Sequence, residues 1–192
     1  MQEKCWRVNI FNIKMKKFLI ALIIFLIPVK SFGLIEVDIT RGNLNPLPIA
    51  VSPLSIDEES RKNFENILKK KNIGSEISLI VEKNLKVSGL FNPLDKDAFL
   101  QEPDIANLKP RFEDWNLIKA QALITGKVSY TDEKLRVEFR LWDVLAGKEM
   151  MALAFTTVAN NWRRVGHIIT DKVYERLTGE KGYFDTRIIY VA

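Results

Sequence analysis

Two stretches of the chain repeat apolar residues at intervals of three and four, the spacing of one face of an α-helix. The first begins near Ser75, a residue suited to an N-cap, and stops at Gly89, a residue suited to a helix C-terminus. Its apolar positions are Ile77, Ile80, Val81 and Leu85. The second has Asn160 or Asn161 as cap, stops at Gly179, and carries Trp162, Val165, Ile169, Val173 and Leu177. The pattern predicts two main amphipathic helices.

A different period appears between residues 122 and 157. Lys134 to Trp142 alternates apolar with charged residues, which is typical of a strand with one buried and one wet face. Ala122 to Tyr130 and Glu149 to Thr157 flank it as further strand signals. Short turns at 131–133 and 145–147 connect the three segments. We therefore expect a three-stranded antiparallel meander.

The remaining signals are shorter. The sequence predicts a strand at Leu34 to Thr40, a buried strand at Ile49 to Val51 that Pro53 ends, and a mostly solvated helix within Ser55 to Asn72. It also predicts an extended piece at Leu90 to Leu94, a loop at Asp95 to Pro110, and a short helix with Phe112 and Trp115. About five strands and two main helices in this order predict a two-layer α/β domain.

The first 33 residues have the features of a secretory signal peptide. Lys14, Lys16 and Lys17 form a positive region, and the apolar run Phe18 to Val29 follows. Ser31 and Gly33 place small residues where a signal peptidase needs them, which predicts a mature start at Leu34. The run is shorter than the about 20 residues of a transmembrane helix, although an uncleaved anchor is the alternative. Met15 is the more natural start, so residues 1–14 are expected to be a spurious extension.

Charge and cysteine content change once this leader is set apart. The whole chain has a pI of about 9.2. Six of its 29 Lys and Arg residues and one of its 24 Asp and Glu residues precede Leu34, which leaves 23 of each sign. A neutral body with mixed charges argues against nucleic-acid binding, which needs clustered Lys and Arg. Cys5, the single cysteine, lies in the leader, so the mature protein is expected to contain no disulfide.

Candidate catalytic groups are few. His167 is the single histidine, and Asp171 follows one helical turn later, so a Ser-His-Asp arrangement is conceivable. No G-x-S-x-G motif supplies a matching serine, and a packing or capping role for His167 is favoured. One histidine without a mature cysteine argues against a zinc site, and no glycine motif for phosphate binding is present. We expect no enzyme activity, no metal, no cofactor and no small-molecule substrate.

The predicted strand at the mature N-terminus has an interpretation of its own. Ile35, Val37 and Ile39 alternate with polar residues, and Gly42 follows. A strand at a free chain end is able to add itself to the edge of another protein's sheet. The alternative is an ordinary edge strand of this domain.

Several spaced motifs resemble those of TolB proteins. Near the C-terminus they resemble the junction between the family's N-terminal domain and its six-bladed β-propeller: Gly166-His167, Asp171, Leu177 to Gly182, Phe184 and Thr186 to Val191. Earlier matches are Pro48-Ile49 with Val51 and Pro53, Ser88 to Leu94, Trp115, and Gly126-Lys127-Val128. The resemblance runs from about Leu34 to Val191 and identifies the chain as a member of this family. The helix expected between Asp57 and Asn72 is a departure, because the corresponding loop in relatives is shorter.

The resemblance implies a fold, a location and partners. The family's first domain has a mixed sheet of about five strands, and the protein works in the periplasm without an enzymatic step. It links inner-membrane TolA to outer-membrane Pal, supporting outer-membrane integrity and invagination during cell division. The segment that corresponds to the family's TolA-binding box, which engages the TolA C-terminal domain, is Leu34, Ile35, Glu36, Val37, Asp38, Ile39, Thr40, Arg41 and Gly42.

The resemblance also gives expected domain bounds. Residues 34–182 are expected to form the α/β domain, and residues 183–192 the start of a β-propeller that is otherwise missing. Since the family's Pal-binding surface lies on the propeller, this chain would keep only the TolA-binding part. A split gene, a decayed gene and a trimmed chain all remain open. The alternative functions are a periplasmic regulator of cell-wall enzymes with a similar domain and, third, a hydrolase.

Overall fold

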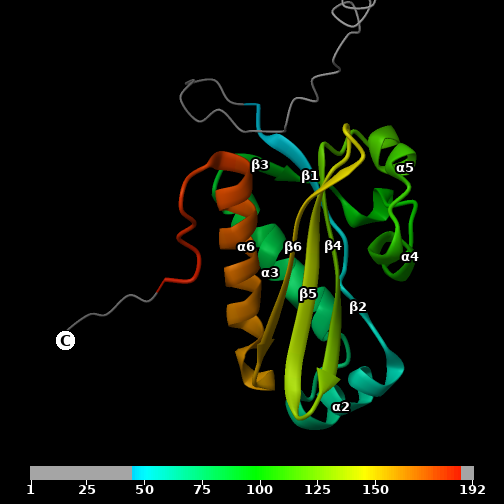
Figure 1. Cartoon of the computed structure of the whole chain (residues 1–192), viewed down its shortest axis with the longest axis vertical. Coiled ribbons are helices and arrows are strands. Elements are labelled where there is room, and N and C mark those ends of the chain that lie inside the picture. The colour runs from blue at the N-terminus through cyan, green and yellow to red at the C-terminus, as the bar shows by residue number, and fades with distance from the viewer. Residues whose placement is uncertain (1–44, 187–192) are drawn as a thin grey trace, which may run out of the picture. The chain divides into compact units, whose positions relative to one another are not determined.

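The computed structural model describes residues 45–186, coloured in Figure 1. The predicted signal peptide, the predicted strand at Leu34 to Thr40 and residues 187–192 lie outside the described residues. The strands are β1 (Leu47–Val51), β2 (Ser55–Ile56), β3 (Phe91–Pro93), β4 (Ala122–Thr131), β5 (Lys134–Asp143) and β6 (Lys148–Thr157). The helices are α2 (Glu58–Leu68), α3 (Ile73–Val87), α4 (Pro103–Leu108), α5 (Phe112–Leu117) and α6 (Trp162–Thr178), with short 3-10 turns at Lys96–Ala98 and Ala159–Asn161.

These strands form one mixed sheet in the order β3-β1-β4-β5-β6. The meander β4-β5-β6 is antiparallel, as predicted, whereas β1 pairs in parallel with both β3 and β4. The two-residue strand β2 also pairs with β4, beyond the end of β1. The predicted α/β class with a mixed sheet of about five strands is confirmed, with β2 as a small addition.

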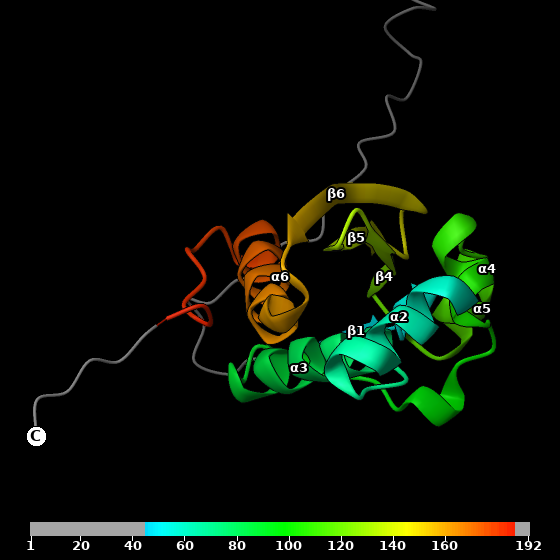
Figure 2. The same ribbon diagram turned by 90° about the horizontal axis from the view of Figure 1, so that it is seen from below.

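The main core lies on one face of the sheet, beneath α3 and α6 (Figure 2). Alternate residues of the strands point toward the two helices, as their period of two requires. The two helices pack closely together, because Gly166 of α6 leaves no side chain between the helices and Ile80 of α3 occupies the space. The predicted helical faces are therefore confirmed, and the fully buried residues include Ile49, Ile77, Leu85, Ile124, Val137, Phe139 and Ile169.

A smaller cluster covers the opposite face of β1 and β4. It contains Ala50 and Leu123 from the strands, Ala106 from α4 and Trp115 from α5. The indole N–H of Trp115 donates to Gln101 Oε1 at 2.7 Å, which satisfies this buried ring. The expectation of a loop from Asp95 to Pro110 is thus wrong in part, since Pro103–Leu108 is helical and Pro103 begins the helix at a position where its missing N–H costs nothing.

The segment that connects β1 and β2 is hydrogen-bonded to a side-chain hydroxyl of α3. Pro53 ends β1 as predicted, and β2 resumes pairing with β4. The Ser78 Oγ accepts from the backbone N–H of Leu54 and donates to the Ser52 carbonyl oxygen, both at 3.0 Å. One buried hydroxyl therefore satisfies the backbone on both sides of the proline.

Side-chain caps define the starts of α2 and α3. Asp57 Oδ1 accepts from the backbone N–H of Ser60 at 2.8 Å, and this bond lowers the pKa of Asp57. The helix expected within Ser55 to Asn72 is confirmed as α2. Asn72 rather than Ser75 caps α3, and its Oδ1 accepts from the Ser75 backbone N–H at 3.4 Å. Both residue types suit an N-cap, so the sequence did not separate them.

The residues after α6 fold back onto that helix. Asp171 accepts hydrogen bonds from the backbone N–H groups of Phe184 and Asp185, and the Asp185 carboxylate forms a two-pronged ion pair with Arg164. Tyr174, whose pKa is raised by burial, packs edge-on against the rings of Tyr183 and Phe184. Residues 183–185 are therefore docked on α6, although they lie beyond the expected domain bound at Gly182.

Candidate interaction site

The predicted binding segment, Leu34 to Gly42, lies outside the described residues, so its geometry stays a prediction. Among residues 45–186, the feature best suited to binding another chain is strand β6. It lies at one end of the strand order and pairs only with β5 within the described sheet. An edge strand of this kind presents N–H and C=O groups along its outer side.

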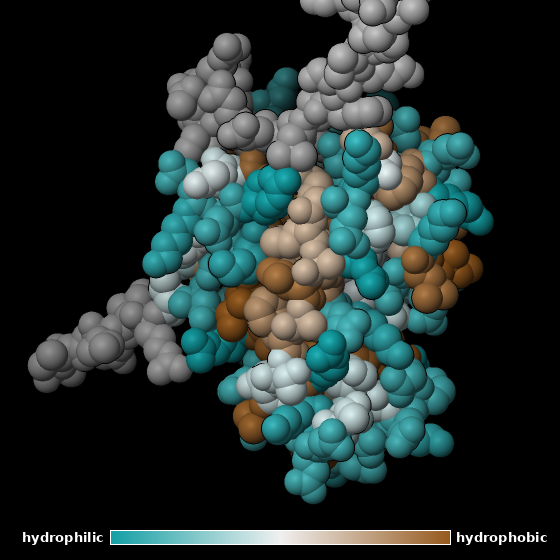
Figure 3. Space-filling model, viewed as in Figure 1, coloured by the Kyte–Doolittle hydropathy of each residue, from teal (hydrophilic) through white to brown (hydrophobic). Residues whose placement is uncertain are grey.

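The middle of β6 exposes an apolar surface, whereas its start is charged. Ala152, Leu153 and Ala154 are exposed, and Leu153 retains 38% of its accessible surface. Figure 3 shows this strand as a band of apolar surface between polar regions. An exposed apolar band on an edge strand is an arrangement that protein partners use.

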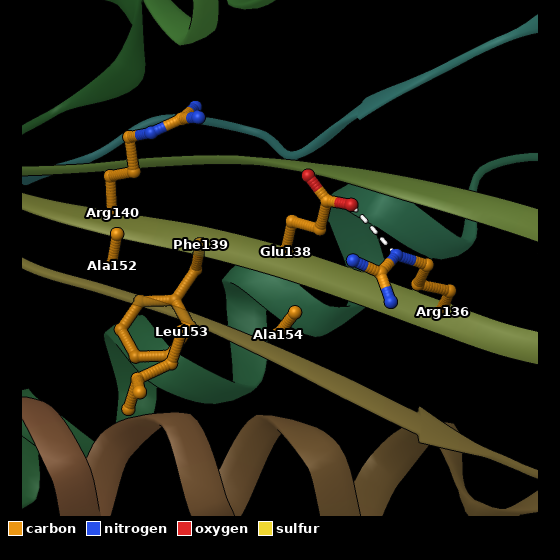
Figure 4. Close-up of a pocket in the computed structure, with 7 residues that line it drawn as sticks. All are labelled: Arg136, Glu138, Phe139, Arg140, Ala152, Leu153 and Ala154. Carbon is orange, nitrogen blue, oxygen red and sulfur yellow. Dashed lines mark hydrogen bonds and ion pairs between the residues drawn. The ribbon is translucent and has the colours of Figure 1, made fainter.

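The two faces of this edge differ in chemistry. Leu153 lies opposite Phe139 in the register, and Figure 4 shows both on the side of α6. The other face carries the predicted wet residues of β5: Arg136, Glu138 and Arg140. With Ala152 and Ala154 they border a shallow hollow of about 190 Å³. The hollow is open because the alanines do not fill the space above the strands.

Ion pairs organise the charged face. Arg136 Nε donates to Glu138 Oε1 at 2.7 Å, the contact dashed in Figure 4. Arg140 Nε lies 3.3 Å from Glu149 Oε2, and its guanidinium donates to the Asn107 carbonyl oxygen on α4. These pairs are partly exposed, so each contributes little to stability. They place two negative groups, Glu138 and Glu149, beside the two positive groups of Arg136 and Arg140.

His167 and Asp171 do not form a catalytic pair. His167 Nδ1 lies 2.9 Å from the side-chain nitrogen of Asn84, which also donates to Thr170 Oγ1 at 3.1 Å. Asp171 is engaged by the docked tail instead. The packing role that the sequence favoured for His167 agrees with these contacts, which tie α6 to α3.

Other kinds of site were searched among the same residues. No group of three or more His, Cys, Asp or Glu side chains between residues 45 and 186 is arranged to hold a metal ion. None of the helices in that range has the length and hydrophobicity of a membrane span. Sequence reasoning found the strand Glu149 to Thr157 and the wet face of β5, yet it missed that β6 is the sheet edge, because strand order depends on contacts between distant segments.

Comparisons with a family model and with a known protein point to the same family. Residues 35–150 match the family model of the TolB amino-terminal domain. The Tol-Pal system protein TolB of Pelagibacter ubique (strain HTCC1062) is 81% identical over 171 residues, which are 89% of this chain and 38% of that protein. The chain thus spans well under half the length of this relative.

Solved structures agree in fold. The crystal structure of TolB from Acinetobacter baumannii matches with a TM-score of 0.59 and 22% identity, over 79% of this chain and 33% of that one. This identity supports the fold alone. A PelC dodecamer from Paraburkholderia phytofirmans matches at a TM-score of 0.43 and 16% identity, over 72% of this chain and 92% of that one, a similarity too low to support a functional argument.

Proposed function

Because this chain belongs to the TolB amino-terminal domain family, we propose that it is a periplasmic adaptor of the Tol-Pal system that works by protein contacts and without a catalytic step. The observation that carries the proposal is the 81% identity to a Tol-Pal system protein TolB. In the proposed role, the adaptor links TolA to Pal and so supports outer-membrane integrity and invagination during division. We assign the TolA-binding part of this role to residues of this chain, which spans 38% of that relative.

The proposed contact with TolA is made by Leu34 to Gly42. In an extended conformation, Ile35, Val37 and Ile39 project from one side and Glu36 and Asp38 from the other. The backbone of such a segment is able to pair with a sheet edge on the TolA C-terminal domain, and the three apolar side chains fill pockets beside that edge. Affinity then comes from backbone pairing and specificity from the apolar side.

Calorimetric titration of the TolA C-terminal domain tests this contact. Deleting residues 34–42 is expected to abolish binding and to leave the circular dichroism spectrum and thermal midpoint nearly unchanged. A triple variant with Ile35, Val37 and Ile39 replaced by Ser should lose most of the affinity. The matched control replaces Glu36 and Asp38 by Ser and should lose less. Unaltered affinity after the deletion would show that TolA is bound elsewhere on the chain. No binding by the intact chain would favour the alternative role as a regulator of other periplasmic proteins.

The proposed location depends on processing of the leader. We propose that residues 1–33 are removed and that the product starts at Leu34. N-terminal sequencing and intact mass of the exported protein check this directly. Retention of Phe18 to Val29 in the mature protein would instead support a membrane anchor.

The proposed boundary of the α/β domain needs adjustment. Tyr183, Phe184 and Asp185 are packed on α6, so the structural unit extends past Gly182. We propose that any following domain begins after Asp185. Limited proteolysis should therefore spare the bonds between 182 and 185 while the domain is folded.

A further inference from the structure

We propose that two copies of this chain associate through β6, pairing antiparallel about a two-fold axis at Leu153. The two sheets would then form one continuous sheet across the interface. This inference concerns self-association and does not depend on the Tol-Pal role. It rests on the composition of the β6 edge and on the charges of the β5 face beside it.

Within residues 45–186, the devices by which sheets avoid such pairing are confined to the start of β6, where Lys148 and Glu149 are charged and Met150 forms a bulge. Natural edge strands are short, carry charges or proline, or are covered. From Met150 to Thr157 the strand contains no charged residue, proline or glycine. The opposite edge shows the contrast, because β3 has three residues and ends in Pro93. The Met150 carbonyl oxygen already accepts from Arg176, so pairing between copies would begin at Met151.

A two-fold axis at Leu153 matches the faces of the two strands. It places Met151 opposite the partner's Phe155 and Ala152 opposite the partner's Ala154. Met151, Leu153 and Phe155 all lie on the face toward α6, since they pair with the inward residues Leu141, Phe139 and Val137. The two Leu153 side chains meet on the axis, and their exposed surface is covered. A slip by one residue would set inward residues against outward ones.

Charge selects this register among those that match the faces. Glu138 lies beside Ala154, and Arg140 lies beside Ala152. The two-fold axis therefore aligns Glu138, Ala154, the partner's Ala152 and the partner's Arg140 in one row across four strands. Three strand spacings separate the charged residues, about 14 Å between backbones, and the two alanines leave the intervening space open. To meet there, Glu138 exchanges its pairing with Arg136, and Arg140 its pairing with Glu149, for the partner's residue. Symmetry produces the pair twice.

The neighbouring registers are disfavoured by the same charges. With the axis at Ala152, Arg140 faces the partner's Arg140 across the row. With the axis at Ala154, Glu138 faces the partner's Glu138, and Arg140 faces the partner's Arg136. Like charges that extend toward each other over the alanines repel. The row of opposite charges at Leu153 thus gives one preferred dimer.

Sedimentation equilibrium of the purified chain over a concentration series tests the proposal. A monomer–dimer equilibrium is expected, and Leu153→Lys should leave only monomer. Leu145→Lys is the matched control, because Leu145 is 63% exposed in the β5–β6 turn and away from the proposed contact. Circular dichroism verifies that each variant is folded. A monomer at every concentration, or a dimer that Leu153→Lys preserves, would overturn the proposal.

Charge exchange tests the register and remains decisive if Leu153→Lys fails to fold. Glu138→Arg and Arg140→Glu should each weaken dimerisation about tenfold, since each replaces two attractive contacts by repulsive ones. The double variant restores both pairs and should recover most of the affinity. Additive weakening in the double variant would contradict this register. If only the chain lacking residues 34–42 dimerises, the edge is covered by that segment, and the second copy is not its occupant.

Discussion

The carboxylate of Asp171 accepts a 2.7 Å hydrogen bond from the backbone N–H of Phe184, thirteen residues further along the chain. Its second oxygen accepts from the N–H of Asp185 at 3.0 Å. A single side chain on α6 therefore anchors two consecutive residues of the tail. Gly182 permits this approach, since a Cβ atom there would lie 2.4 Å from the Asp171 Cα.

Removal of the docked tail should destabilise the domain. Phe184 packs against the main core, and Tyr174 contacts both Tyr183 and Phe184. We expect a chain that ends at Gly182 to melt more than about 5 °C below the full chain, a shift of roughly 1–2 kcal/mol. Differential scanning calorimetry measures the shift, and a chain that ends at Thr186 isolates the effect of residues 183–186. Equal midpoints for the three chains would show that the docked residues contribute nothing.

The Asp171 anchor itself should be measurable. Asp171→Ala leaves two backbone N–H groups without their acceptor, so a loss of about 1–2 kcal/mol in the free energy of unfolding is expected. Lys172→Ala is the control, because it removes only an exposed ion pair with Glu175 and should change stability by less than about 0.5 kcal/mol. Urea denaturation quantifies both. An Asp171→Ala variant with an unchanged free energy of unfolding would indicate that water replaces the carboxylate at no cost.

The hydroxyl that bridges β1 and β2 gives a third prediction. Ser78→Ala removes the acceptor for the Leu54 N–H in a buried position, and a loss of about 1–3 kcal/mol in the free energy of unfolding is expected in urea denaturation.

The start of α3 gives a separate prediction, which compares Asn72→Ala with Ser75→Ala. Because Asn72 is the N-cap, Asn72→Ala should cost about 1 kcal/mol and Ser75→Ala much less. A larger stability loss for Ser75→Ala than for Asn72→Ala would show that Ser75 is the N-cap of α3, as the sequence predicted.

Gly126 should tolerate no side chain. A Cβ atom there would lie 2.3 Å from the Glu138 carbonyl oxygen on the neighbouring strand β5. This oxygen belongs to the backbone, so it moves only if the strand moves. We expect Gly126→Ala to cost about 1–3 kcal/mol by forcing the strands apart. Gly89→Ala provides a comparison, because that site is open and its cost comes from a φ of +73° alone. A higher thermal midpoint for Gly126→Ala than for Gly89→Ala would contradict the close approach of the strands.

The cap at Asp57 predicts a pH dependence. The hydrogen bond from the Ser60 N–H, followed by the Ser60 hydroxyl and Lys127, holds the pKa of Asp57 below its ordinary value of 3.8. A carboxyl with a lowered pKa in the folded state stabilises the fold above its unfolded pKa, and this stabilisation is lost as the pH falls through the folded pKa. The stability difference between wild type and Asp57→Ala should therefore be full at neutral pH and shrink below about pH 4. Urea titrations across this range check it, and a difference independent of pH would show that the charge is not involved.

Local periodicity predicted the elements whose neighbours are close in sequence. The alternation at Lys134 to Trp142 placed Val137 and Phe139 inside and Arg136 and Glu138 outside, as the structure confirms. The spacing from Trp162 to Leu177 likewise gave the buried face of α6. In these segments each residue's environment follows from the period of its own element.

The misses have a common physical cause. The helix α4 exposes Ile105 and Leu108, so its six residues carry no clear apolar face. The spacing raised a His167–Asp171 pair only as a conceivable arrangement, and it gave no sign that Asp171 accepts hydrogen bonds from backbone groups after the helix. The position of β6 at the end of the described sheet was equally absent from the local pattern. All three depend on contacts between distant segments.

The parallel pairing of β1 with β4 sets the order in which this chain is able to fold. Ile49 pairs with Ala122, and Val51 with Ile124, so β1 waits for residues that are synthesised more than seventy positions later. The meander β4-β5-β6 needs only its own short turns. Because non-local pairing requires closing a long loop first, the meander is expected to form before the first strand is inserted beside it. The earliest strand in the described sequence is therefore among the last to join the sheet.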